Sequence, residues 1–160
     1  MSRLTHMAER LITQGLCLDA AARLIEGVAG PVLEIGLGKG RTYDHLRELL
    51  PDREIFTFDR DVHAPPALVP DGAHLILGDF RDTLPRVAAT IGAAALAHAD
   101  IGSDDRAADT ELAAAVAASL AECLAPGAIV ATDRAMDGEG WAALDLPLGA
   151  RWPYFMYRVE

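Results

Sequence analysis

Short apolar segments alternate with helix-like ones over most of the chain. The apolar segments are too short for surface helices, so each is predicted to be a strand buried on both faces of a sheet. Strands separated by helices form right-handed βαβ crossovers, which predicts a three-layer α/β/α Rossmann-like sandwich with a mostly parallel sheet. Ligands of such sheets bind beyond the carboxyl ends of the strands. The predicted strands are residues 31–36, 54–59, 73–79, 93–100 and 128–133, and the predicted helices are about 42–50, 84–91 and 109–124.

Two helices are expected before this alternation, and one more helix and strand are expected to continue it at the C-terminal end. Leu4, Met7, Leu11 and Ile12 have helical spacing, and a second helix, capped by Asp19, is expected to follow a break at Gly15 and to run to Gly30. Near the other end, a short helix is expected around 140–144. Residues 151–159 alternate aromatic with other side chains, as an edge strand or a subunit contact does.

The charge of the chain restricts its ligands. Fourteen basic and 24 acidic residues give a net charge of −10, a field that repels the phosphates of nucleic acids. A small ligand is therefore expected. The 160 residues are enough for one domain with a hydrophobic core but not for a second full domain.

The cysteines and the N-terminus indicate a cytoplasmic protein. Cys17 and Cys123 lie far apart without a CxxC pair, so they are expected to be free thiols in a reducing compartment. Arg3, Glu9 and Arg10 interrupt the N-terminal segment where a signal peptide requires an apolar stretch, and no other segment has the pattern of a membrane span.

The most specific motif is Glu34-Ile35-Gly36-Leu37-Gly38-Lys39-Gly40, between the first predicted strand and the helix after it. Glycines at this point allow a ligand to approach the backbone and expose amides at a helix N-terminus. The dinucleotide fingerprint GxGxxG is not met, because Arg41 stands where its third glycine belongs. A Walker loop is not met either, because Gly40 follows Lys39 in place of serine or threonine.

The motif E-x-G-x-G-x-G resembles the first motif of the class I S-adenosylmethionine-dependent methyltransferases. Further strand ends match the same family in order: Asp59 closes the second strand, Gly78-Asp79-Phe80 the third and Asp100 the fourth, and Leu124-Ala125-Pro126-Gly127-Ala128 precedes the fifth. The resemblance covers roughly residues 30–134. It implies S-adenosyl-L-methionine as the cofactor, with Asp59 on the ribose hydroxyls and with the carboxylate of Asp79 and the backbone of Phe80 on adenine. The cofactor-binding residues that it implies are Glu34, Gly36, Gly38, Gly40, Asp59, Arg60, Asp79 and Phe80.

Several of these residues have a purely structural alternative. The glycines occur between strand and helix in many α/β domains for packing alone. Asp59 could cap the turn that follows it. Asp79 could be the N-cap of the next helix.

Asp100 and His98 are the candidate catalytic residues. Asp100 lies at the methyl-transfer position that the resemblance implies, and His98, two residues earlier on the same strand, could act as a general base. A hydrogen-bonded core histidine is the alternative for His98. Catechol-type relatives hold a divalent cation near this point, but here Arg134 follows Asp133 and its guanidinium would repel the ion. No metal is therefore predicted, and Arg134 is expected to pair with Asp100 or Asp133.

The resemblance implies methyl transfer from S-adenosyl-L-methionine by in-line displacement. The chain has little sequence beyond the core, so a small-molecule acceptor is expected under the N-terminal helices of residues 1–30, without nucleic acid or membrane partners. A homodimer is a further expectation, from the aromatic C-terminal segment. Two alternatives stay open: a non-catalytic S-adenosylmethionine- or nucleotide-binding protein, and an NAD-dependent oxidoreductase.

Overall fold

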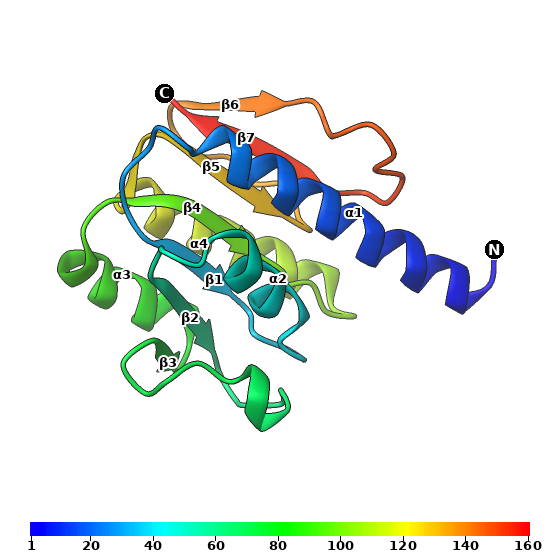
Figure 1. The fold of residues 1–160 in the computed structure, drawn as a ribbon, viewed down its shortest axis with the longest axis horizontal. Helices are drawn as coiled ribbons and strands as arrows, with labels where there is room; N and C mark the ends of the chain where they lie inside the picture. Colours follow the sequence, from blue (N-terminus) through cyan, green and yellow to red (C-terminus); the bar gives the residue numbers. More distant parts are fainter.

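The computed structural model describes residues 1–160 and contains one seven-stranded sheet with helices on both faces (Figure 1). In chain order, the elements are α1 Arg3–Leu24, β1 Val32–Ile35, α2 Arg41–Leu49, β2 Ile55–Asp59, the 3₁₀ helix η1 Pro66–Leu68, β3 Leu75–Leu77, α3 Phe80–Ile91, β4 Ala94–Ala99, α4 Arg106–Ala121, β5 Leu124–Thr132, β6 Trp141–Leu144 and β7 Phe155–Val159.

The strand order is β3-β2-β1-β4-β5-β7-β6. The first five strands of this order pair in parallel, β7 runs antiparallel to β5, and β6 runs antiparallel to β7. The chain reverses its direction of travel across the sheet between β1 and β4, so the ligand-binding switch point of the fold lies at their carboxyl ends. The predicted Rossmann-like fold with a mostly parallel sheet is confirmed.

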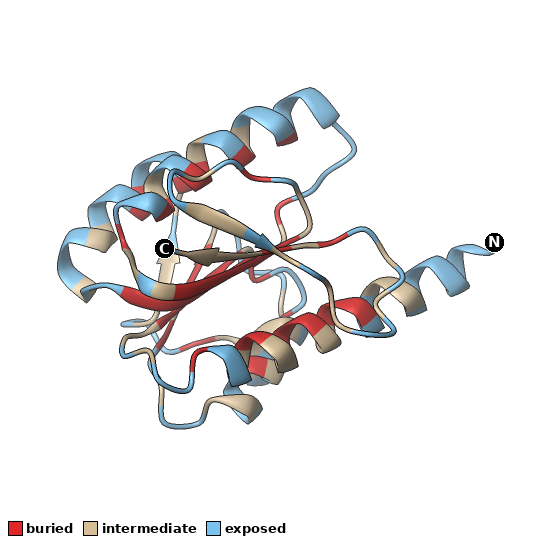
Figure 2. Cartoon of the chain, turned by 90° about the horizontal axis from the view of Figure 1, so that it is seen from above, coloured by how far each residue is buried: buried red, intermediate tan, exposed pale blue.

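Two apolar clusters hold the layers together. Leu96 and Ile129 point from the sheet towards α1 and α2, where they meet Leu18. Ala97 and Val130, one position further along the same strands, belong to the cluster on the side of α3 and α4. Buried residues accordingly lie on the sheet-facing side of the long helices, and in α1 they begin only at Thr13 (Figure 2). The chain contains no helix with both the length and the hydrophobicity needed to cross a membrane.

The predicted helix break at Gly15 is wrong, because α1 is one continuous helix of 22 residues with Gly15 inside it. A glycine inside a helix costs about 1 kcal/mol relative to alanine. That cost is outweighed here because Thr13 and Gln14 on one side of Gly15, and Cys17 and Leu18 on the other, are all buried against the sheet. Asp19 is consequently an internal residue of α1 and not a cap.

Two other helices begin earlier than predicted. Helix α3 starts at Phe80 and not at 84, because the Asp79 side chain accepts a hydrogen bond from the Arg81 amide and caps it. Helix α4 spans Arg106–Ala121 in place of 109–124, because the Asp105 side chain accepts hydrogen bonds from the Ala107 and Ala108 amides and caps it.

The C-terminal region also differs from expectation. Trp141–Leu144 is the strand β6 and not a helix, because it pairs along its length with β7. The predicted strand at 151–159 narrows to Phe155–Val159, and it lies inside the sheet between β5 and β6 and not at an edge. Four apolar residues fit a strand and a helix turn equally well, so pairing with a distant segment decides between them.

Candidate functional site

The glycine-rich loop connects β1 to α2 at the switch point of the sheet. Gly36 and Gly40 are packing positions: a Cβ on Gly36 would lie 2.5 Å from the Asp100 carbonyl oxygen, and one on Gly40 would lie 2.8 Å from Leu68 Cβ. Gly38 differs, because a Cβ there would meet nothing within 4 Å. It is exposed and has a φ of 51°. Gly38 is therefore the position at which the loop offers bare backbone to a ligand.

Asp59 fixes the shape of this loop. Its Oδ2 accepts hydrogen bonds from the Leu37 amide at 2.9 Å and from the Gly38 amide at 3.1 Å, and its Oδ1 accepts one from the Arg60 amide at 2.7 Å. The carboxylate also lines the adjoining cavity. It is thus placed to hold the loop and to accept hydrogen bonds from a ligand.

Asp79 is engaged by its own helix and by two arginines. Besides capping α3, it accepts a hydrogen bond from the Arg60 guanidinium at 2.8 Å and lies 3.5 Å from that of Arg81. The amide of Arg81 and the two positive charges hold its pKa below the usual range. The cap alternative is thus present in the structure, while Arg60 and Phe80 line the cavity next to it.

The cavity beside Gly38 and Asp59 has a volume of about 420 Å³. It spans the carboxyl ends of β1, β2 and β4 and the start of α3, where the fold places ligands. Its lining consists of Gly36, Gly38, Asp59, Arg60, His63, Phe80, Arg81, Asp100, Ile101, Gly102, Ser103, Ala108, Asp109 and Leu112.

Asp100 is tied to the N-terminal helix. Arg10 Nη2 donates to both carboxylate oxygens, at 2.7 and 2.6 Å, and Gln14 Nε2 donates to Oδ2 at 2.9 Å. A second, small cavity of about 80 Å³ lies between α1 and the glycine loop, and Asp100 lines this cavity as well as the larger one. Asp100 therefore stands where the two cavities meet.

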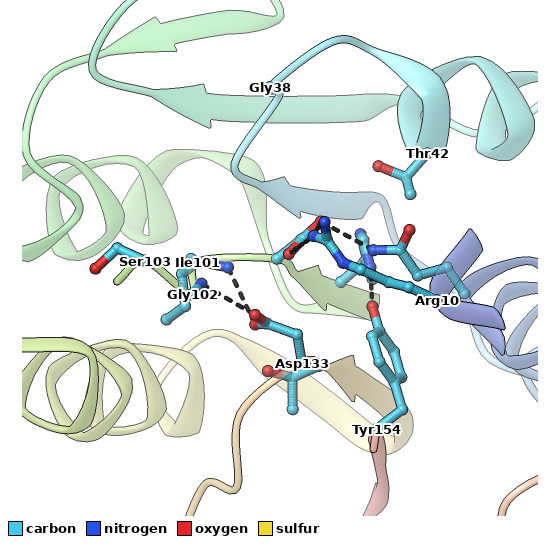
Figure 3. A network of polar contacts seen from close by, with 12 residues as sticks. Arg10, Gly38, Thr42, Ile101, Gly102, Ser103, Asp133 and Tyr154 are labelled. Carbon is cyan, nitrogen blue, oxygen red and sulfur yellow. Dashed lines mark hydrogen bonds and ion pairs between the residues drawn. The ribbon is translucent and has the colours of Figure 1, made fainter. Parts of the chain in front are cut away.

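A buried hydrogen-bonded network lies behind Asp100. Glu34 and His98 are neighbours on β1 and β4, and His98 Nδ1 lies 2.8 Å from Glu34 Oε2. Glu34 Oε1 accepts a hydrogen bond from the Thr42 hydroxyl at 2.6 Å, and His98 Nε2 shares a short hydrogen bond with the Tyr154 hydroxyl. Figure 3 shows Thr42 and Tyr154 on opposite sides of this network.

Neither Glu34 nor His98 has any exposed side-chain surface. Burial opposes protonation of His98, but the charge of Glu34 and its hydrogen bond outweigh that effect, so the pKa of His98 is raised. Burial and nearby carboxylates raise the pKa of Tyr154 well above its usual value. With both ring nitrogens engaged and no surface on a cavity, His98 has the geometry of a hydrogen-bonded core residue, and the general-base hypothesis has no geometric support.

Asp133 and Arg134 follow β5, and the pairing expected for Arg134 is wrong. Its Nη2 donates to Asp109 at 2.8 Å and not to Asp100 or Asp133, because the Asp109 side chain reaches back from the first turn of α4. Asp133 instead accepts hydrogen bonds from the amides of Ile101 and Gly102, at 3.1 and 3.0 Å (Figure 3). Burial and the negative charge of Asp100 raise the pKa of Asp133.

Asp109 shapes the loop that follows Asp100. Its carboxylate accepts hydrogen bonds from the Ser103 amide at 2.8 Å and from the Ser103 hydroxyl at 2.6 Å, in addition to that from Arg134. These bonds lower the pKa of Asp109. Ser103 is thereby fixed at the border between the 420 Å³ cavity and a cleft of about 680 Å³ that extends to Trp152.

Sequence reasoning did not find Arg10, Gln14 or Tyr154 as site residues. Arg10 and Gln14 lie four positions apart on one face of a helix, which is the only local signal that both point to one partner. Tyr154 has no such signal, since it reaches His98 from 56 positions away.

The chain is similar to a known family and to solved structures. The model of a family described as S-adenosyl-L-methionine methyltransferase matches residues 1–159. A crystal structure of an S-adenosyl-L-methionine methyltransferase from Silicibacter pomeroyi is similar, with a TM-score of 0.93 and 40% sequence identity over 100% of this chain and 99% of that one. No curated protein matches the sequence.

Two more distant structures share the fold alone. CalS11, described as a TDP-rhamnose 3′-O-methyltransferase of calicheamicin biosynthesis, has a TM-score of 0.67 and 24% identity over 92% of this chain and 79% of that one. TrmN from Thermus thermophilus has a TM-score of 0.64 and 17% identity over 89% of this chain and 48% of that one.

The resemblance inferred from the glycine loop and the strand ends is thus confirmed over nearly the whole chain, together with S-adenosyl-L-methionine as the cofactor. The oxidoreductase alternative finds no support in these matches. The chain belongs to the S-adenosyl-L-methionine methyltransferase family.

Proposed function

We propose that this protein transfers a methyl group from S-adenosyl-L-methionine to a small-molecule acceptor by in-line displacement. One observation carries the proposal: Asp100 lines both the cavity beside the glycine loop and the small cavity under α1, and the 680 Å³ cleft adjoins these two cavities through residues next to Asp100. Gly102 and Ser103 border both the first cavity and the cleft, and Arg10 borders both the second cavity and the cleft. A cofactor and an acceptor bound on the two sides would approach each other there.

The residues beside the glycine loop fit the proposed cofactor. Gly38 leaves open space at the loop, Asp59 offers carboxylate oxygens to ribose hydroxyls, and Phe80 offers an aromatic face and a backbone amide. The small cavity adds Gln14 and Arg41 next to Asp100, which suits the charged methionine end. When bound, S-adenosyl-L-methionine supplies an electrophilic methyl group on a sulfonium. The chain itself supplies alignment, which is worth much of the rate in such a displacement.

We assign Asp100 the role of orienting the acceptor, together with the loop of Gly102 and Ser103. Arg10 and Gln14 together donate three hydrogen bonds to this carboxylate, so an acceptor group would use the remaining lone pair on Oδ1 or replace Gln14. Two further residues of the predicted cofactor site act through a neighbouring side chain: Glu34 accepts a hydrogen bond from Thr42 at the start of α2, and Asp79 accepts one from Arg60, which lines the cavity.

Thermal unfolding with added ligands tests the cofactor. S-adenosyl-L-methionine and S-adenosylhomocysteine should each raise the melting temperature, by an amount that grows with the logarithm of the ligand concentration divided by Kd, whereas NAD should not. Release of S-adenosylhomocysteine in the presence of a panel of small acceptors then tests the reaction. Cofactor binding without turnover on any acceptor would favour the non-catalytic alternative, and stabilisation by NAD alone would contradict the proposal.

We further propose that residues 1–160 act as one domain and that α1 covers the acceptor. The single continuous sheet supports the first point, and the contacts of Arg10 and Gln14 with Asp100 support the second.

We also propose a cytoplasmic location. It is supported by the two buried free cysteines, whose pKa values burial raises to about 11.

We also propose a homodimer, but through α1 and not through the aromatic strand, which β6 covers. Leu4 and Ile12 on the projecting half of α1 are 80% and 58% exposed, and Met7 and Leu11 beside them are also exposed. Sedimentation of the wild type and of Ile12→Asp tests this. A monomeric wild type would contradict it.

A further inference from the structure

The 680 Å³ cleft has an unusual charge composition for this molecule. Although the whole chain carries a net charge of −10, three of the nine residues around the cleft are arginines. The lining otherwise contains two aspartates and a single large apolar side chain, an indole. The nine residues are Arg10, Gly102, Ser103, Asp104, Arg106, Asp133, Arg134, Trp152 and Pro153.

The three arginines differ in what they already bind. Arg10 pairs with Asp100 and Arg134 pairs with Asp109, each through Nη2 alone. Arg106 is exposed and makes no ion pair and no side-chain hydrogen bond. All five of its N–H donors are therefore free, and Nη1 of each of the other two arginines has no partner either.

The carboxylates of the cleft do not cancel these donors. Asp133 is committed to the amides of Ile101 and Gly102. Asp104 is exposed and forms no ion pair with Arg106. The cleft consequently has more unused hydrogen-bond donors than acceptors, with a guanidinium among them, and this composition matches carboxylate and phosphate oxygens.

We propose that the methyl acceptor is a small polar molecule with a carboxylate or phosphate group, which Arg106 binds with the free donors of Arg10 and Arg134. The inference rests on the proposed function, because it assigns the cleft to the acceptor. The polar lining excludes acceptors that bind mainly through apolar surface, such as lipids, because their burial here would leave these donors unpaired.

Trp152 provides a direct test by nuclear magnetic resonance. Its indole borders the cleft, whereas the indole N–H of Trp141, the other tryptophan, is buried elsewhere and serves as an internal reference. Sodium phosphate and, separately, sodium acetate are titrated into the protein saturated with S-adenosylhomocysteine, at constant ionic strength with chloride. We expect a saturable shift of the Trp152 indole signal and none for Trp141.

Two arginine variants separate specific binding from general charge. Arg106→Ala should weaken the binding of phosphate by about tenfold or more, the loss expected for a charge-assisted hydrogen bond. Arg151→Ala is the matched control, because Arg151 is also exposed and free of ion pairs but does not line the cleft. An unsaturable Trp152 shift, or equal weakening in the two variants, would overturn the proposal.

Matched acceptors then test the class of substrate. A hydroxy acid is compared with its primary amide, and a sugar phosphate with its free sugar, by release of S-adenosylhomocysteine. Turnover should be confined to the charged member of a pair and should fall in Arg106→Ala; equal turnover of neutral members would overturn the proposal. If S-adenosylhomocysteine fails to stabilise the protein, the proposed function fails, whereas stabilisation with a flat Trp152 titration defeats this inference alone.

Discussion

Gly38 and Gly40 have similar backbone conformations but different surroundings. Both have a positive φ, 51° and 80°, which disfavours a branched side chain. Only at Gly40 would a Cβ collide with another part of the chain, at Leu68. The pair therefore separates a residue that is glycine for its ligand from one that is glycine for packing.

We predict that Gly38→Val abolishes cofactor binding in a protein that remains folded, because the side chain would occupy the open space beside the loop. Calorimetric titration with S-adenosylhomocysteine measures the affinity, and circular dichroism checks the fold. Gly40→Val is the control, and it should lower the melting temperature more than Gly38→Val does. Unchanged affinity in Gly38→Val would remove this position from the binding site.

Asp59→Ala should weaken cofactor binding by roughly 1–3 kcal/mol, the range for losing charged hydrogen bonds. Asp59→Glu should lose less. Because Asp59 also holds the amides of Leu37 and Gly38, the loss could arise from the ribose or from the loop. A cofactor analogue without ribose hydroxyls decides: it should bind wild type and Asp59→Ala about equally, and a difference between them would assign Asp59 to the loop alone.

At the scale of elements, the parallel strands and the glycine loop could be predicted because their signals are local. Apolar runs and a strand-end motif need no partner to be recognised. The continuity of α1 could not be predicted, because it depends on burial of Thr13, Gln14, Cys17 and Leu18 under the sheet. The position of β6 depends equally on β7, and the ion pair between Arg10 and Asp100 joins residues 90 positions apart.

The continuity of α1 gives a stability prediction. Gly15→Ala should raise the free energy of unfolding by about 0.5–1 kcal/mol, since alanine restricts the unfolded chain and its Cβ would meet nothing within 4 Å. Urea unfolding measures the change. A loss of stability would indicate that the helix bends at this residue.

The contacts of His98 on β4 with Glu34 on β1 and with Tyr154 before β7 make the free energy of unfolding depend on pH. Because the pKa of His98 is raised in the folded protein, folding is favoured most below the unfolded pKa of about 6.5. This contribution is lost as pH rises through the folded pKa. Urea unfolding between pH 6 and 9 should show stability falling with pH, more steeply in wild type than in His98→Gln.

His74 contributes in the same direction, because the hydrogen bond that it donates to the Asp71 carboxylate raises its pKa. The residual slope in His98→Gln is therefore expected to come from His74 and, above about pH 8, also from Cys17 and Cys123, whose pKa values are raised to about 11. Equal slopes in the two proteins would show that His98 stays neutral.

At the scale of the whole molecule, the distribution of the carboxylates bears on whether the protein needs a metal ion. The chain has 24 acidic residues, yet no three metal-ligating side chains cluster anywhere in the fold. Asp100 forms an ion pair with Arg10, and Asp133 accepts hydrogen bonds from the amides of Ile101 and Gly102. We predict that cofactor binding and turnover persist in excess chelator. Activity lost with chelator and restored by magnesium would move both aspartates to metal coordination.

Because α1 is unbroken, its two ends move together as one rod, about 33 Å long at 1.5 Å per residue. Cys17 and Ala21 fix the rod in the core, and Arg10 lies about 10 Å along it from Cys17. A tilt of about 10° about the buried half would displace Arg10 by about 2 Å, enough to break its contacts with Asp100. Small repacking beneath Cys17 would thus be amplified at Arg10, which lines the cleft proposed for the acceptor. How tightly the C-terminal half of α1 is held would then decide whether the contact between Arg10 and Asp100 opens.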